Sequence, residues 1–370
     1  MIEQDTCLPP ITTHAPLAPG FTGSGAEYFR IWIVNLLLTV ATFGIYSAWA
    51  KTRRLQYFYR NTHLAGAGFD FRGNPKAILR GRILAVIVLA AYHYAFGFSV
   101  TAGVAMVALL LAGLPFMMRS ALRFRLSNTW YRGLPFGFDG GILPAYAAYL
   151  PPMAMFVLPG ALVAMMPGKP IVAAVFLLYL FWPLMHGAMR RYQHANLLYG
   201  DQHAGFTLSS MKLAGTYVRV ILAGLGVMVA FGIVVYAATR MRSGHPVGSV
   251  LTVVCAALLT YLHILLSGPF VMVRMNNLAW SDTRFPGVRI ACAMKARSYL
   301  RLQVVNVVLT LLTLGLYRPF AAVRTWRYRV AHVRIDAPEG FDMATALAAR
   351  RGATAAGDGT ADFLGVDISW

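Results

Sequence analysis

The chain has 370 residues, of which 58% are apolar and 12% are charged, and its mean hydropathy is +0.58. A soluble globular protein of this length has about a quarter of its residues charged, so the composition excludes that class and indicates a polytopic membrane protein. The 33 Lys and Arg residues outnumber the 13 Asp and Glu residues, which leaves a formal net charge of +20.

The first 29 residues contain no Lys or Arg and no cleavage site after a short apolar core. We therefore expect residues 1–29 to form a retained N-terminal segment rather than a removable signal peptide. A Gly-Phe or Arg-Phe pair first occurs here and recurs, mostly before apolar stretches, at Phe21, Phe69, Phe138, Phe206, Phe285 and Phe341. Such a repeat predicts equivalent units on one side of a membrane.

Residues 30–46 align without a gap with residues 301–317, near the other end of the chain. The shared polar positions are Asn35, Thr39 and Thr42 in the first copy and Asn306, Thr310 and Thr313 in the second. Both copies contain Thr-x-x-Thr-x-Gly, where a helix can break while threonine hydroxyls satisfy the freed backbone groups. The two copies are therefore predicted to be the same kind of element.

The uncharged part of the second copy, Leu302 to Tyr317, has 16 residues. As a helix it would span roughly 24 Å, which is short of the roughly 30 Å hydrocarbon core. We expect both copies to be re-entrant or interfacial elements. Full crossings remain the alternative, because the twenty apolar residues 31–50 are enough to cross once.

Three apolar runs lie between these copies, at residues 83–118, 142–189 and 220–273. Each holds enough residues for two crossings of roughly 20, so each predicts a transmembrane helical hairpin. The predicted turns contain Gly or Pro and lie near residues 97–99, 167–170 and 240–246. The fold class is thus a mainly α polytopic membrane protein, with six spans if the terminal copies re-enter and eight if they cross.

Most of the positive charge lies between the apolar runs. Of the 33 Lys and Arg residues, 28 are in the segments 51–82, 119–143, 190–215, 274–301 and 318–351. The positive-inside rule places these segments, and both termini, in the cytoplasm. Their expected partners are anionic membrane lipids. Nucleic acid is disfavoured, because the basic residues are scattered at helix ends and not clustered with aromatic residues.

Short segments with strand character precede the Phe pairs. Residues 61–71, 128–139 and 196–206 each have a Gly-rich or Asp-containing turn between apolar or aromatic ends, which predicts cytoplasmic β-hairpins, and 277–285 and 332–341 are weaker copies. Each copy supplies an acid, namely Asp70, Asp139, Asp201, Asp282, and Asp336 with Asp342. These acids either pair with Arg at the helix ends or satisfy turn geometry.

Several motifs carry a family resemblance. They are the run Glu27-Tyr-Phe-Arg30 through Thr39, then Gly44-Ile-Tyr46-Ser-Ala-Trp49-Ala-Lys51-Thr-Arg53-Arg54, Asn61-Thr62, Gly73-Asn74-Pro75, and the tail from Ala361 to Ile368. In their order and over nearly the whole length, the chain resembles the YjgN-like bacterial inner-membrane proteins. The resemblance implies a multi-pass inner-membrane location, and it brings no activity or functional residues.

Motifs for chemistry are missing. All 13 Asp and Glu residues lie outside the apolar runs, which argues against a carrier coupled to protons or sodium ions. No catalytic constellation occurs in a supporting context, so we expect no enzyme, cofactor or metal site. His93, His186 and His263 lie within or beside the spans, where a hydrogen-bonded packing role is commoner than a proton or metal path.

Two functions remain. A small-molecule permease or channel would use the broken helices, with Asn35, Thr39, Thr42, Asn306, Thr310 and Thr313 as the candidate substrate path. These side chains could equally do no more than satisfy a broken helix. The alternative is a non-catalytic membrane organiser whose basic face binds anionic lipid or a cytoplasmic partner. We expect a repeat-built membrane domain at 30–342 and a flexible tail at 343–370.

Overall fold

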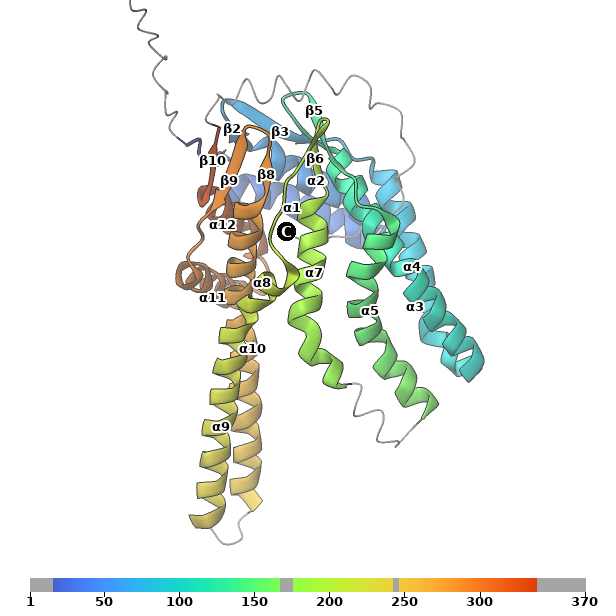
Figure 1. Cartoon of the computed structure of the whole chain (residues 1–370), viewed down its shortest axis with the longest axis vertical. Helices are drawn as coiled ribbons and strands as arrows, with labels where there is room; N and C mark the ends of the chain where they lie inside the picture. The colour runs from blue at the N-terminus through green and yellow to red at the C-terminus, as the bar shows by residue number, and fades with distance from the viewer. Residues whose placement is uncertain (1–15, 167–175, 242–245, 338–370) are drawn as a thin grey trace, which may run out of the picture.

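A computed structural model of the chain describes residues 16–166, 176–241 and 246–337. The fold is mainly helical, and its short strands gather at one end of the molecule, from which long helices project (Figure 1). The predicted tail at 343–370, the copy at Phe341 and most of the second and third turns lie outside the described residues.

Helices alternate with short strands along the whole chain. In order, the elements are β1 (Gly20–Phe21), α1 (Gly25–Ala41), α2 (Ser47–Arg60), β2 (Thr62–Leu64), β3 (Ala67–Phe71), α3 (Pro75–Phe98), α4 (Val100–Ser127), β4 (Thr129–Tyr131), β5 (Leu134–Phe138), α5 (Ile142–Met165), the 3-10 helix η1 (Phe176–Phe181), α7 (Trp182–Ala195), β6 (Leu197–Tyr199), β7 (Gln202–His203), α8 (Ser210–Ala214), the 3-10 helix η2 (Gly215–Tyr217), α9 (Val218–Met241), α10 (Pro246–Asp282), β8 (Arg284–Phe285), β9 (Val288–Cys292), α11 (Ala296–Leu312), α12 (Arg318–Ala331) and β10 (Val333–Asp336).

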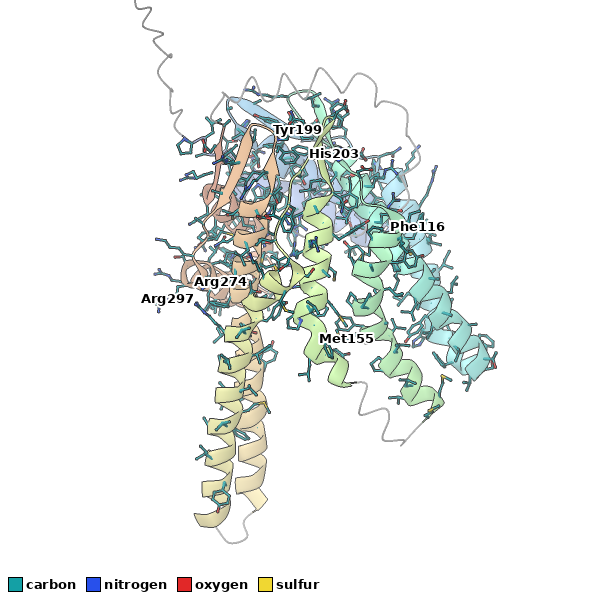
Figure 2. The ribbon with its side chains drawn as sticks, viewed as in Figure 1. Phe116, Met155, Tyr199, His203, Arg274 and Arg297 are labelled. Carbon is teal, nitrogen blue, oxygen red and sulfur yellow. The ribbon has the colours of Figure 1, made fainter. Side chains whose placement is uncertain are left out.

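Four helical stretches within the described residues are long and apolar enough to cross a membrane. They are Pro75–Phe98, Val100–Ser127, Ile142–Gly160 and Ser210–Ile233. Apolar side chains such as Val86, Leu89 and Met228 are more than 60% exposed on these helices, which is costly in water and favourable in hydrocarbon. Figure 2 shows Phe116 and Met155 on the projecting helices, whereas Tyr199 and His203 lie among the crowded side chains at the strand end.

The two terminal copies adopt the same helix-turn-helix shape. Helix α1 stops at Ala41 and α11 stops at Leu312, within the Thr-x-x-Thr-x-Gly pattern of each copy. In the turns that follow, Phe43 and Leu314 both have φ of +49°, and Gly44 and Gly315 have φ of +90° and +93°. The left-handed backbone ends each helix, and α2 and α12 then carry the chain onward.

Five helices end in the same way before a strand. The side chain at each helix C-terminus donates a hydrogen bond to the carbonyl four residues earlier, which satisfies one of the free carbonyls there. The donor atoms lie 2.7–2.9 Å from those oxygens, and the donors are Asn61, Asn128, Asn196, Thr283 and His332. The feature that recurs in each unit is therefore a helix C-terminus capped by a side chain and followed by a strand.

The strands close into a ring. Strands β1 to β7 pair antiparallel in chain order, and β8, β9 and β10 form a second group. Two backbone bridges join the groups, Gly205 with Arg284 and Leu17 with Ile335. Through the second bridge, Leu17 just before β1 pairs antiparallel with β10, so segments from opposite ends of the described chain lie edge to edge.

Strand register corrects two sequence interpretations. Phe21 pairs with Thr62 and Phe71 pairs with Thr129, and each of these threonines directly follows the asparagine at a helix end. The position equivalent to Phe21 in the repeat is therefore Phe71 and not Phe69. The fourth hairpin begins at Arg284 and not at Asn277, because α10 continues through Asp282. Asn277 instead exchanges hydrogen bonds with the backbone of Met294, 2.8 and 3.0 Å long, and so holds the chain that follows β9.

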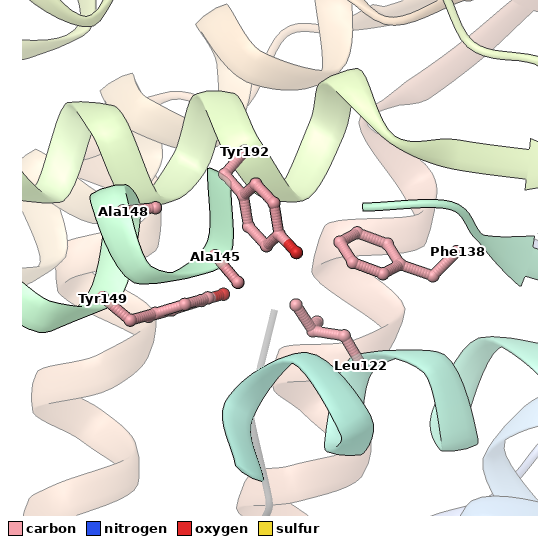
Figure 3. Packing of buried hydrophobic residues seen from close by; sticks show 6 residues of the cluster. All are labelled: Leu122, Phe138, Ala145, Ala148, Tyr149 and Tyr192. Carbon is pink, nitrogen blue, oxygen red and sulfur yellow. The ribbon is translucent and has the colours of Figure 1, made fainter. Parts of the chain in front are cut away.

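The cores lie where the helices meet the strands. In the largest, Leu122 of α4, Phe138 of β5, Tyr149 of α5 and Tyr192 of α7 point toward one another (Figure 3). The hydroxyl of Tyr192 donates to the carbonyl of Gly141 at 3.1 Å, so the aromatic ring is buried without leaving a polar group unpaired. This core holds α4, α5 and α7 against one another next to the strands.

Two of the predicted acids join elements, in two different ways. Asp70 of β3 pairs with Arg60 at 2.8 Å and with Arg72 at 3.3 Å. Asp282, at the end of α10, accepts hydrogen bonds from the backbone of Thr207 (2.6 Å) and Leu208 (2.7 Å) and from the hydroxyl of Thr207 (2.8 Å). Burial alone would raise the pKa of Asp282, but these hydrogen bonds outweigh it and lower the pKa below its ordinary value.

We expect Asp282→Ala to lower the free energy of unfolding by about 1.5 kcal/mol, because three donors lose a charged acceptor at a partly solvated site. Urea titration of the purified protein in detergent micelles, followed by circular dichroism, measures the change. Asp201→Ala in the β6–β7 turn is the matched control and should have no effect. Because the pKa of Asp282 is lowered by folding, its stabilising effect should fade as the pH falls below about 3.9. Equal stability of the two variants at neutral pH would contradict this role.

Candidate central cavity

A cavity of about 640 Å³ lies within the ring of strands. Every strand from β2 to β10 contributes to its wall, together with α2, α4, α10, α11 and α12. The side chains alternate along each strand, so one row of the ring faces this space. The repeat thus builds a single cavity from elements that are far apart in the sequence.

Aromatic rings from neighbouring hairpins form one wall of the cavity. Phe69 stacks on Tyr131 at 4.5 Å between ring centroids, and Phe136 lies 5.0 Å from Tyr199. The Tyr131 hydroxyl donates to the Leu64 carbonyl at 2.7 Å, and the Tyr199 hydroxyl donates to the Tyr131 carbonyl at 3.2 Å. Each tyrosine thereby holds the preceding hairpin. Burial, with Tyr131 adding to it, raises the pKa of Tyr199 to about 12, so this wall stays uncharged.

The charged groups of the cavity wall are all cations. Lys51 and Arg54 come from α2, Arg125 from α4 and Arg329 from α12, and no Asp or Glu is among the described residues that line the cavity. The guanidinium of Arg125 donates to the Tyr59 hydroxyl at 3.3 Å, and that of Arg329 donates to the Tyr299 hydroxyl at 3.0 Å. These bonds to neutral hydroxyl groups orient the two guanidiniums. The wall therefore favours an anion.

The six candidate path residues are not brought together. Each threonine hydroxyl donates to the carbonyl four residues earlier in its own helix, at 2.6–2.7 Å, in both copies. Thr42 and Thr313 also accept hydrogen bonds from the backbone of Tyr46 (2.9 Å) and Tyr317 (3.0 Å). The hydroxyls thus satisfy backbone groups freed by the helix breaks. Among the six, Asn306 alone lines the central cavity described above.

The paired asparagines differ in their surroundings. Both are buried, and the Oδ1 atom of each has no hydrogen-bond partner among the described residues. The Nδ2 atom of Asn306 donates to the hydroxyl of Thr325 at 3.2 Å, across to α12. Asn35 is not among the residues lining the cavity. The sequence repeat therefore places equivalent residues in different structural surroundings.

The histidines near the spans take part in packing contacts. His93 lies edge-on to Tyr94, with 5.0 Å between ring centroids, and Nδ1 of His186 lies 2.7 Å from the Tyr217 hydroxyl. Sequence reasoning missed His194, which is fully buried and hydrogen-bonded to Thr283 at 3.0 Å. Its position two residues before a helix cap carries no local pattern that could have indicated this burial. Among the described residues, no group of three or more His, Cys, Asp and Glu could hold a metal ion.

Comparison with known proteins gives a family and distant relatives. A family model described as "Bacterial protein of unknown function (DUF898)" matches residues 16–363. The chain is 32% identical over 147 residues to "Inner membrane protein YjgN" of Salmonella typhimurium, which is 37% of this chain and 36% of that protein. It is 32% identical over 125 residues to the protein of the same name in Escherichia coli K12, covering 32% and 30%. No solved structure matches.

The aligned part is about a third of the length of these curated relatives. Their names state a location and no activity. The family match, by contrast, covers β1 through β10 and so includes every strand of the ring.

Proposed function

Because this chain belongs to the DUF898 family of bacterial proteins of unknown function, and is a membrane protein with inner-membrane relatives, we propose a function from its own cavity. In this proposal the protein binds an anionic amphiphile within the ring of strands. An anionic amphiphile here means a molecule with an acyl chain and a carboxylate or phosphate head group. The observation that carries this proposal is a wall of aromatic and aliphatic side chains whose charged members, within the described part of the chain, are four cations and no carboxylate.

Size and chemistry of the cavity support a ligand of this class. A volume of about 640 Å³ lies within the range of about 300–1,000 Å³ that small-molecule sites occupy. Apolar lining favours an acyl chain by about 25 cal/mol for each Å² removed from water. Guanidinium and ammonium groups then select an anionic head group, which neutralises part of their charge.

The proposed membrane arrangement puts the ring of strands in the cytoplasm. The basic segments surround the ring, which agrees with the positive-inside rule, and the apolar helices project away from it (Figure 1). Helix α1 has 17 residues, or about 26 Å, too short for a full crossing with a basic helix directly after it. We therefore favour α1–α2 and α11–α12 as half-inserted hairpins, with both chain ends cytoplasmic.

The tips of these hairpins support insertion. Phe43 is 98% exposed and Leu314 is 95% exposed at the equivalent turn position. Ile45 and Leu312 beside them are 58% and 75% exposed. Exposing a cluster of large apolar side chains to water is unfavourable, and transferring the cluster into lipid is favourable.

A permease or channel is the second candidate function. Its support is the buried Oδ1 of Asn306 in the cavity wall, which lacks a hydrogen-bond partner and could accept one from a passing polar ligand. A non-catalytic organiser role rests on the basic residues around the ring and does not require the cavity.

Binding of oleate to the full-length protein in detergent micelles tests the amphiphile proposal. We expect saturable binding of oleate, and about tenfold weaker binding in the double variant Arg54→Gln/Arg125→Gln, because two cations that face the carboxylate are lost. Oleyl alcohol, which lacks the charge, should bind the wild type and the variant equally. Arg297→Gln is the control, since Arg297 lies in the first turn of α11, at the outer edge of the molecule (Figure 2), and not in the cavity wall. Oleate binding that is absent, or that is the same in both Arg variants, would refute the proposal.

Substitution of the two asparagines separates binding to the purified protein from transport in cells. Asn306→Ala should change oleate affinity and Asn35→Ala should not, because only Asn306 lines the cavity. A transport path through both copies predicts instead that both substitutions impair ligand uptake in cells at unchanged protein level.

A further inference from the structure

A second pocket, of about 540 Å³, lies between α1 and α2 and has no residue in common with the central cavity. It goes beyond the amphiphile site proposed above, because none of that argument uses these residues. Its lining is Arg30, Ile31, Val34, Arg53, Gln56, Tyr57, Arg60 and Asn61. Three arginines from two helices thus surround one space.

Two of the three arginines keep their charge available. Arg60 pairs with Asp70 at 2.8 Å. In the described part of the chain no carboxylate pairs with Arg30 or Arg53, and both are exposed. The guanidinium of Arg53 lies 5.7 Å from the centroid of the Tyr46 ring, a contact that leaves its donors free. Glu27, one turn before Arg30, accepts a hydrogen bond from the Tyr57 hydroxyl at 3.1 Å.

The remaining polar groups of the pocket are already bonded. The Nδ2 atom of Asn61 donates to the Tyr57 carbonyl at 2.9 Å, and the Nε2 atom of Gln56 donates to the Phe71 carbonyl at 3.2 Å. Recognition in this pocket therefore depends on the two guanidiniums. Guanidinium forks match the oxygen geometry of a phosphate and bind it through paired hydrogen bonds.

An exposed apolar strip leads away from the pocket along α1. Val34 belongs to the pocket wall and is 47% exposed, and Leu37 and Val40 on the following turns are 63% and 68% exposed. The strip ends at Phe43 in the turn. From Arg30 to Phe43 the chain covers about 20 Å at helical rise. This surface has cations at one end and an apolar strip of that length beyond them. It is therefore complementary to one phospholipid molecule, which has an anionic phosphate and an apolar acyl chain.

We propose that this pocket binds the phosphate of a membrane phospholipid between Arg30 and Arg53, with an acyl chain along Val34, Leu37 and Val40. The second terminal copy carries Arg301 and Arg324 at the positions equivalent to Arg30 and Arg53, and an exposed apolar tip at Leu311, Leu312 and Leu314. The pair of hairpins would anchor the ring of strands to the head groups of one leaflet at two points.

Binding of short-chain phosphatidylglycerol to the full-length protein in detergent micelles, with oleate present at saturation, tests the site. Oleate keeps the central cavity occupied if it binds there, and the experiment is unaffected if it does not, so the two proposals can fail separately. We expect the double variant Arg30→Gln/Arg53→Gln to bind phosphatidylglycerol about thirtyfold more weakly. Its oleate affinity should be unchanged. Arg289→Gln/Arg297→Gln removes the same charge outside both pockets and should bind as the wild type does.

Three further measurements identify the ligand chemistry. Arg30→Lys/Arg53→Lys keeps the charge but not the paired hydrogen bonds, so it should recover part of the binding, which also shows that the Gln variant does not fail through misfolding. Diacylglycerol with the same acyl chains should not compete, and inorganic phosphate should compete only weakly. Unchanged phosphatidylglycerol affinity in the Gln variant, equal loss in the Lys variant, or competition by diacylglycerol would overturn the proposal. Inorganic phosphate binding as tightly as phosphatidylglycerol would overturn the lipid assignment in favour of a soluble anion.

Discussion

Gly187→Ala is expected to lower the free energy of unfolding by about 3 kcal/mol, at the upper end of the cost of overpacking. A Cβ atom at Gly187 would lie 2.4 Å from the carbonyl oxygen of Ser210 and 3.3 Å from Cβ of Leu213. Because the nearer atom belongs to the backbone, no side-chain rotation relieves the clash. Helix α8 must therefore move away from α7, and α7 is also part of the core that contains Tyr192.

Gly113→Ala in α4 is the matched control. A Cβ atom there would meet no atom within 4 Å, so this substitution should leave the free energy of unfolding unchanged or slightly raised. Urea titration in detergent micelles, followed by circular dichroism, measures both variants. If Gly187→Ala and Gly113→Ala unfold at the same urea concentration, the close contact between α7 and α8 does not exist in solution.

Lowering the pH from 6.5 to 4.5 should cost about 2 kcal/mol of stability through His194 alone. Burial, with Arg190 adding to it, lowers the pKa of His194 to about 3, whereas a histidine in the unfolded chain has a pKa of about 6.5. The folded protein therefore holds the neutral ring. Its contribution to stability is complete above about pH 6.5 and is lost progressively as the pH falls toward about 3.

The contacts of His194 explain why the neutral ring is required. The Thr283 hydroxyl donates to the Ala279 carbonyl at 2.7 Å, so it accepts from Nδ1 of His194 at 3.0 Å. Trp280 and Phe206 enclose the ring, with centroid distances of 4.9 and 5.7 Å. A second proton would place a positive charge on the buried ring. The free-energy cost of burying that charge exceeds the stabilisation from the hydrogen bond to Thr283.

Urea titrations at pH 6.5, 5.5 and 4.5 measure this slope. His194→Gln cannot titrate and should lose it, even if it is less stable at neutral pH. His203→Gln is the control, because the His203 side chain is 66% exposed, and it should keep the slope of the wild type. A wild-type stability that does not change over this interval would show that the His194 ring is protonated at no cost.

Local signals in the sequence predict much of this architecture. The Thr-x-x-Thr-x-Gly pattern marks the ends of α1 and α11, because Thr and Gly satisfy or permit the backbone geometry within one turn. Ser99 lies between α3 and α4 at the predicted Gly-Phe-Ser break and accepts from the Ala102 backbone at 3.0 Å. The sequence places the weaker fourth hairpin too early, because α10 continues five residues past Asn277, to Asp282.

The proposed sites show where local reasoning ends. Asn35 and Asn306 are equivalent in sequence, yet only Asn306 lines the cavity. The difference arises from which elements pack against α1 and α11, which no pattern within the two copies encodes. The cations of the cavity come from α2, α4 and α12, and in the sequence they resemble any other positive charge at a helix end.

Composition, apolar run length and backbone chemistry act within one or two turns, so local patterns are sufficient to predict the class of protein, the helical stretches and the places where helices break. The pairing of Leu17 with Ile335, and the closure of the strands into a ring around a cavity, can be read from the three-dimensional fold alone. Strand register between distant segments depends on which edges meet in space, and the free energy of that pairing has no local counterpart in the chain.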